Sequence, residues 1–157
     1  MSEEVRITWD WLPIGEFRLT PEERLTLELT PEGKREAGRE GAIYRFLFPR
    51  EHHVAAYIGE TANLTRRMGQ YCGPGRSKPK KNGKEGNQNL RVNEHVVDAL
   101  RSGLRVRVEI ARNCEAALSY GPRDLRPVKL NRKDHRLIIE GAAIASAWAG
   151  SHELINI

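Results

Sequence analysis

Four side chains of this sequence have the types needed for chemistry on a phosphate group. Tyr44 and Tyr57 each stand in a short apolar run, Arg67 follows ten residues after Tyr57, and Glu140 interrupts a long apolar stretch. One carboxylate is enough for Mg²⁺, which keeps several waters and accepts a phosphate oxygen as a further ligand. A guanidinium offers a fixed fork of donors to developing negative charge. A neighbouring divalent cation can also lower the high pKa of a tyrosine.

The apolar pattern predicts the elements that position Tyr44, Tyr57 and Arg67. Residues 42–48 and 54–59 are short runs rich in β-branched and aromatic side chains, and the intervening PREHH favours a hairpin. Residues 61–71 are predicted to be a helix, with Thr61 or Asn63 as its N-cap. Arg67 is therefore expected on a helix that follows directly on the second strand.

The rest of the chain predicts a long basic loop, two helices and one strand. Residues 72–89 are dense in Gly, Pro, Lys and Asn and show no periodicity, which indicates a loop. Residues 93–102 are predicted to be a helix, and residues 104–110 alternate apolar and charged side chains as a half-buried strand does. Residues 112–133 are expected to be irregular. A helix over residues 134–149 is apolar nearly all round, which predicts that it is buried.

Length and charge narrow the class of protein. The chain has 157 residues and a net charge of +5, enough for one ordinary domain. No apolar run is long enough for a membrane span, and Cys72 and Cys114 form neither a disulfide framework nor a CxxC metal site. The charge is uneven, because residues 1–40 carry a net −4 and residues 63–91 a net +7. We therefore expect a cytoplasmic protein with a polyanionic partner and no membrane association.

The hairpin and its helix resemble the GIY-YIG nuclease superfamily. That name describes two strand motifs, which read here as Gly41-Ala42-Ile43-Tyr44 and Tyr57-Ile58-Gly59. The stretch YIGETANLTRRMGQY is similar to the family's second strand and first helix. The resemblance covers residues 41–71 well and 134–157 loosely. Ala42 departs from it, because it stands where the first motif has a glycine.

The resemblance implies an α/β fold and a reaction. The expected fold is a small three-stranded, mostly antiparallel sheet flanked by helices, occupying residues 41–157. Residues 1–40 are then an N-terminal accessory segment, which could add a strand. The implied activity is endonucleolytic hydrolysis of DNA phosphodiester bonds that depends on Mg²⁺ or Mn²⁺. An RNA-directed nuclease and a non-catalytic nucleic-acid-binding module on the same fold are the alternatives.

The family's site residues transfer onto matching positions of this chain. Tyr44 resembles the tyrosine proposed as general base or as its relay, and Tyr57 the tyrosine that positions water and phosphate. Arg67 matches the arginine that neutralises charge on the phosphorane. The remaining matches are Tyr71 at a helix position that holds Tyr or His in relatives, Glu140 as the single metal ligand, and Asn156 as the C-terminal asparagine that supports the site.

Three points of the site remain open from sequence alone. Arg91 and His95 are four residues apart on a predicted helix and therefore share a face, so they could replace Arg67 and Tyr71 in the site or contact DNA instead. Glu60 could add a second metal contact or pair with Arg67. Glu140 itself could form an ordinary intrahelical pair with Arg136.

A wider set of basic residues is predicted to bind nucleic acid. Phosphate contacts supply much of the affinity of such proteins and carry no sequence information. Because 157 residues leave little room for a separate DNA-reading domain, we expect either low specificity of the chain alone or specificity supplied by a homodimer or a protein partner. The predicted nucleic-acid-binding residues are Arg66, Arg76, Lys78, Lys80, Lys81, Lys84, Arg91 and His95.

Overall fold

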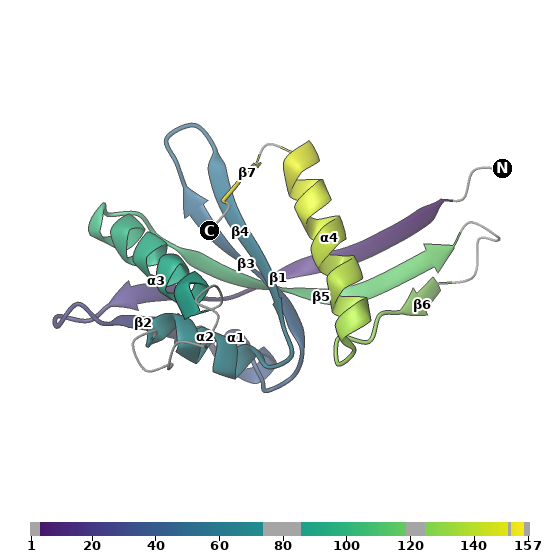
Figure 1. The fold of residues 1–157 in the computed structure, drawn as a ribbon, viewed down its shortest axis with the longest axis horizontal. Helices are drawn as coiled ribbons and strands as arrows, with labels where there is room; N and C mark the ends of the chain where they lie inside the picture. The colour runs from purple at the N-terminus through teal and green to yellow at the C-terminus, as the bar shows by residue number, and fades with distance from the viewer. Residues whose placement is uncertain (1–3, 74–85, 119–124, 151, 156–157) are drawn as a thin grey trace.

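The fold is a twisted seven-stranded sheet with helices on both faces (Figure 1). The computed structural model describes residues 4–73, 86–118, 125–150 and 152–155. The strands follow the order β2-β1-β5-β3-β4-β7, and β6 pairs with β5 outside this path. The elements are β1 (Val5–Leu19), β2 (Leu25–Leu29), α1 (Pro31–Glu36), β3 (Ala42–Pro49), β4 (Val54–Thr61), α2 (Leu64–Cys72), α3 (Gly86–Arg101), β5 (Arg107–Leu118), β6 (Leu125–Pro127), α4 (Lys133–Ala149) and β7 (His152–Leu154).

The α/β class is confirmed, whereas the expected three-stranded sheet is wrong in size. The three expected strands do pair in the order β5-β3-β4, with β3 antiparallel to both of its neighbours. Residues 1–40 extend this unit, because β1 pairs along β5 and then pairs with β2. The short strand β7 adds a parallel pair to the opposite edge of β4. The sequence did not predict the size of the sheet, because the side-chain pattern within one strand does not show which further strands pair with it.

The connection between α1 and β3 ties the N-terminal segment to α2. The carbonyl of Glu40 accepts from the Leu64 N–H, and the carbonyl of Gly38 accepts from both the N–H and the hydroxyl of Thr65. These bonds satisfy donors that the first turn of a helix leaves free. Asn63 is the N-cap, because its side chain accepts from the Arg66 N–H at 2.9 Å. The position of α2 is therefore fixed from outside the hairpin.

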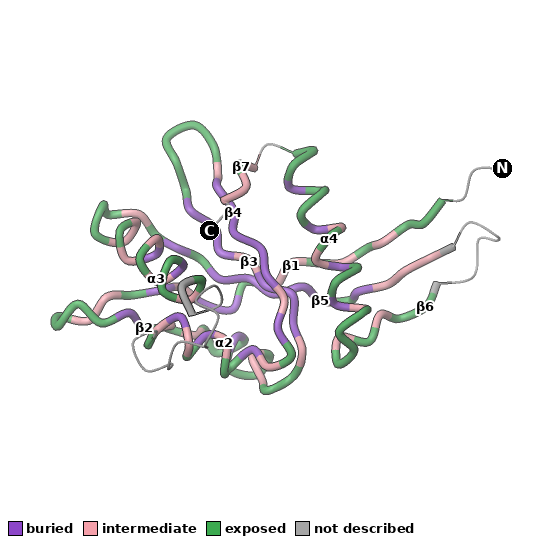
Figure 2. Tube along the Cα trace, in the orientation of Figure 1, coloured by how far each residue is buried: buried purple, intermediate pink, exposed green. Residues whose placement is uncertain are grey.

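Two apolar clusters lie on opposite faces of the sheet, as the alternation of strand side chains requires. Tyr44, Phe46 and Phe48 pack with α2 and α3 on one face. Ile43 and Ile58 pack with α4 on the other. Figure 2 shows the buried residues concentrated where these strands cross. A side chain of α4 and one of α2 consequently approach the β3–β4 pair from different sides.

Two predicted element boundaries and one predicted burial pattern differ from the structure. Helix α3 begins at Gly86, within the segment expected to be a loop, and β5 continues to Leu118 through residues expected to be irregular. Helix α4 is where it was predicted, but it is not buried all round. Trp148 is 78% exposed, and Leu137, Ile138 and Ile144 are also exposed. The reason is that α4 has a sheet beneath only one side, so its opposite flank has no described partner.

The ring of Tyr44 crosses β4 at a position without a side chain. Tyr44 and Gly59 are register partners. A Cβ added at Gly59 would lie 2.5 Å from the Tyr44 hydroxyl and 2.7 Å from its Cζ. The glycine of the second motif is therefore required for steric reasons, because it leaves room for the phenol to reach across the strand.

Replacing this glycine tests that contact. Gly59→Ala is expected to lower the free energy of unfolding by about 1–3 kcal/mol, the usual cost of overpacking a core, because Tyr44 is 1% exposed and has nowhere to move. Urea unfolding followed by circular dichroism measures the change. Gly141→Ala is the matched control, since nothing lies within 4 Å of its Cβ position. In a helix that change should stabilise the protein, by up to about 1 kcal/mol. A Gly59→Ala protein as stable as wild type would contradict the account.

Candidate active site

Three buried tyrosines from three elements share one hydrogen-bonded cluster. The hydroxyls of Tyr44 on β3 and Tyr71 on α2 are 2.5 Å apart, and those of Tyr57 on β4 and Tyr71 are 3.4 Å apart. Tyr44 and Tyr71 are each 1% exposed and Tyr57 is 7% exposed. The cluster therefore forms a row of three hydroxyls in which Tyr57 is the most accessible member.

Burial raises the pKa of both Tyr44 and Tyr71 well above the ordinary value of 10. For Tyr44 the charge of Tyr57 adds to burial, while the hydrogen bond to Tyr71 and the charge of Arg67 act in the opposite direction. For Tyr71 the charges of both other tyrosines add to burial. Both phenols are consequently protonated at neutral pH, and neither is a base without a neighbouring cation or a proton acceptor.

Arg67 stands one helical turn before Tyr71, on the same side of α2. Leu64 and Met68 are buried and hold the helix on the sheet, which leaves Arg67 half-buried beside the cluster. Its Nη1 donates to Oδ1 of Asn89 at 3.3 Å. Its Nε is buried and has no hydrogen-bond partner among the described residues. A buried guanidinium donor without a partner suits an anionic ligand.

Two asparagines of α3 form hydrogen bonds with α2. Asn89 holds Arg67, and the Asn93 side chain donates to the Tyr71 carbonyl at 2.6 Å. They are four residues apart and face the same way. Sequence analysis missed both. Asn89 falls at the end of the segment expected to be a loop, and Asn93 has no chemistry of its own that would single it out.

Glu140 lies on α4, which packs on the other face of the sheet, and it is within electrostatic range of Tyr44. Its charge acts on Tyr44 and contributes to the raised pKa of that phenol. Burial raises the pKa of Glu140 itself, the charge of Glu60 adds to this, and a hydrogen bond from the Glu60 backbone N–H opposes both. The side chain of Glu140 makes no ion pair with any described residue. It is therefore a half-buried carboxylate available to a cation.

The pairings left open for Glu60 and Glu140 are now assigned. Arg136 Nε donates to Glu60 Oε2 at 2.6 Å, so Arg136 pairs with Glu60 rather than with Glu140. Glu60 consequently does not pair with Arg67 either. Two carboxylates lie near each other at this edge of β4, and one of them is neutralised by a guanidinium.

The donor set fits Mg²⁺ or Mn²⁺ through one carboxylate. The described residues contain no group of three or more His, Cys, Asp or Glu side chains that could enclose a metal ion. Mg²⁺ is usually held by one or two carboxylates together with water and substrate phosphate, and a dedicated protein cage is not needed. Glu140 would be the protein ligand in such a site.

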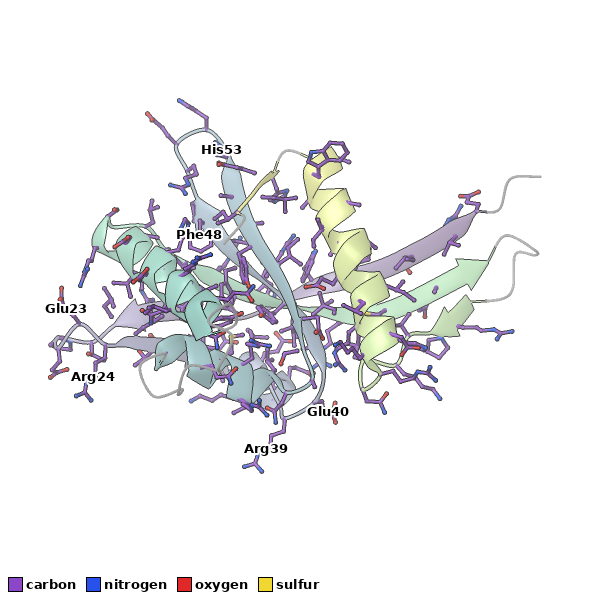
Figure 3. The ribbon with its side chains drawn as sticks, viewed as in Figure 1. Glu23, Arg24, Arg39, Glu40, Phe48 and His53 are labelled. Atoms are coloured by element: carbon purple, nitrogen blue, oxygen red, sulfur yellow. The ribbon has the colours of Figure 1, made fainter. Side chains whose placement is uncertain are left out.

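His95 and Arg91 do not join the tyrosine cluster. The His95 ring packs edge-on against Phe48, with ring centroids 5.0 Å apart. Phe48 is four residues from Tyr44, which is about 13 Å along a strand. Figure 3 shows Phe48 far from Glu40, which lies two residues before β3. Burial and Arg50 lower the pKa of His95. Arg91 is exposed on α3. The arrangement that completes the site with Arg91 and His95 is therefore not the one observed.

The other predicted residues are exposed or fall outside the described residues. Arg66 is exposed on α2, beside Arg67. Asn156 and the predicted basic residues Arg76, Lys78, Lys80, Lys81 and Lys84 lie outside the described residues, so their roles stay predictions. None of the described helices is long and apolar enough to cross a membrane.

Comparison with known proteins identifies no relative. No protein-family model, curated protein or solved structure matches the chain. The residues of the site and their geometry therefore carry the functional argument.

The buried tyrosines make a prediction about pH. Because their pKa values are raised in the folded state, the folded protein keeps protons that the unfolded chain loses above about pH 10. The free energy of unfolding should then fall as the pH rises past 10, by up to about 1.4 kcal/mol per pH unit for each such tyrosine. Tyr44→Phe should flatten this slope by about one proton, as measured by urea unfolding between pH 9 and pH 11. Between pH 7 and pH 9 the two slopes should agree. Equal slopes above pH 10 would contradict the raised pKa.

Proposed function

We propose that the protein is a divalent-metal-dependent endonuclease of the GIY-YIG type that hydrolyses DNA phosphodiester bonds. The observation that carries the proposal is the convergence of Tyr44, Tyr57, Tyr71, Arg67 and Glu140 from four elements and two faces of the sheet. Four of them come from the β3–β4 hairpin and α2, and Glu140 comes from α4, far along the chain. Their proximity supports a common chemical purpose better than it supports independent structural roles.

The cation would be held by Glu140 and would act as a Lewis acid on the phosphate and on bound water. Arg67 binds the phosphate through donors that include its unpartnered Nε. Its half-buried position keeps those donors in place before the substrate arrives, so little reorganisation is needed when charge develops.

The tyrosines are proposed to relay a proton. Tyr44 and Tyr71 are covered, so they act through hydrogen bonds and do not touch the substrate. Tyr44 Oη can accept a proton only as its own proton passes to Tyr71 Oη, 2.5 Å away. The proton that Tyr44 accepts would come from the attacking water. Tyr71 would pass its own proton to Tyr57, 3.4 Å away, and the more accessible Tyr57 hydroxyl would release one proton to solvent, so each tyrosine ends with the proton count it began with. This arrangement favours the relay role for Tyr44 over that of a free base.

The effect of Arg67 on the cleavage rate can be measured separately from its effect on DNA affinity. Arg67→Ala should reduce the cleavage rate at saturating DNA by about 10²–10³-fold, as for loss of one preorganised donor, with a smaller loss of affinity. Arg67→Lys should recover little, because an ammonium cannot reproduce the fork. Single-turnover cleavage of a labelled duplex measures the rate.

Two neighbouring arginines serve as controls for this series. Arg66→Ala removes the adjacent, exposed charge and should weaken binding while the saturating rate stays close to wild type. Arg91→Ala tests the rival site. Loss of cleavage in Arg91→Ala with an active Arg67→Ala protein would overturn the assignment. Competition between matched DNA and RNA duplexes separates the DNA nuclease from the RNA-directed alternative.

A further inference from the structure

Arg136 is the most deeply buried charged side chain that the proposed chemistry does not use. It is 4% exposed and lies in the first turn of α4. Its Nε donates to Glu60 at 2.6 Å, and its Nη1 donates to the Leu130 carbonyl at 2.9 Å. A buried guanidinium is retained at a cost in desolvation unless it is paired in this way. Its position therefore calls for an explanation.

The contacts of Arg136 join three separate segments at one point. Leu130 precedes α4, Glu60 is near the end of β4, and Gly41 is at the start of β3. A Cβ at Gly41 would lie 1.9 Å from the Leu130 oxygen and 3.1 Å from Arg136 Nη1. The glycine before Ala42 thus lets the chain before α4 approach β3 closely enough for Arg136 to reach Glu60.

Glu60 interacts with both Arg136 and Glu140. Its side chain accepts from Arg136 at 2.6 Å, and its charge lies close enough to Glu140 to add to the raised pKa of that carboxyl group. Arg136 and Glu140 are four residues apart on α4, so they project from the same side of the helix. The Arg136–Glu60 pair therefore holds against β4 the turn of α4 that leads to Glu140.

We propose that Arg136 is a positioning residue that works through Glu60 to fix Glu140 as a metal ligand and to keep the Glu60 carboxylate out of the coordination sphere. This inference rests on the proposed function, because it assigns the support of the same metal site. Partners that orient a ligating carboxylate usually change metal affinity by 10–100-fold when they are removed. Glu140 then remains the single carboxylate that the cation meets.

The test measures Mn²⁺ binding to the full chain without DNA, from the electron paramagnetic resonance signal of free Mn²⁺. Glu140→Gln should abolish this site. Arg136→Lys should weaken Mn²⁺ binding by about tenfold, because an ammonium cannot hold Glu60 and the Leu130 carbonyl in the same geometry. Glu60→Asp keeps the charge and the backbone N–H but shortens the reach to Arg136, and it should weaken binding to a similar degree.

The matched control is another half-buried arginine–glutamate pair of the same sheet. Arg45 donates to Glu109 at 2.7 Å and stacks on Trp11, and it has no ion pair with Glu60 or Glu140. Arg45→Lys should leave Mn²⁺ binding unchanged even if it costs comparable stability in urea unfolding. Should Arg136→Lys fail to fold, the comparison of Glu60→Asp with Arg45→Lys decides the question.

The double variant Glu60→Asp/Arg136→Lys distinguishes a pair from two independent contributions. If the two residues act as one unit, the double variant should bind Mn²⁺ about as well as either single variant. Additive losses, or an Arg136→Lys protein that binds like wild type, would overturn the inference and leave the proposed function standing. A wild-type protein without Glu140-dependent Mn²⁺ binding would instead contradict the proposed metal role, and this inference with it.

Discussion

The passage of the Tyr44 ring over Gly59 is the contact on which the rest of the site depends. Without a side chain at residue 59, the phenol crosses β4 and its hydroxyl meets Tyr71 on α2. The same crossing brings it within electrostatic range of Glu140 on α4, although α2 and α4 lie on opposite faces of the sheet. The site therefore depends on one strand position, residue 59, at which only glycine leaves room for the Tyr44 ring.

This geometry explains why so much of the surrounding structure is fixed from outside the β3–β4 hairpin. Helix α2 is held by the connector before β3 and by two asparagines of α3. Helix α4 is held by the buried Arg136–Glu60 pair. Small shifts of either helix would separate groups that must stay within hydrogen-bonding distance, and catalytic constellations tolerate little displacement. The extended sheet, with β1 and β2 added to the central strands, supplies the rigid base for these attachments.

Sequence patterns predicted the parts of the fold that are dictated locally. The hairpin, α2 and α4 follow from strand alternation, the Asn63 cap and helical periodicity. The hydroxyls of Tyr44, Tyr57 and Tyr71 lie together in the structure, whereas the catalytic roles of the motif residues stay predictions. The outer half of β5 could not be predicted, because these residues form a strand only through their pairing with β1, whose register shifts between Thr8 and Asp10. The exposed side of α4 could not be predicted for a similar reason, since the apolar composition of a helix does not show which of its sides packs against the sheet. Asn89 and Arg136 were missed as site partners because their contacts depend on tertiary approach alone.

Cleavage of supercoiled plasmid tests the central claim most directly, namely that these residues form one metal-dependent phosphodiesterase site. With Mg²⁺ or Mn²⁺, the wild-type protein is expected to convert supercoiled plasmid to nicked and linear forms. Glu140→Ala, prepared in the same way and shown to be folded, should leave the plasmid supercoiled, because the carboxylate that would hold the cation is gone. Identical nicking by the two proteins would contradict the claim, as would a folded wild-type protein that binds the plasmid and never cleaves it.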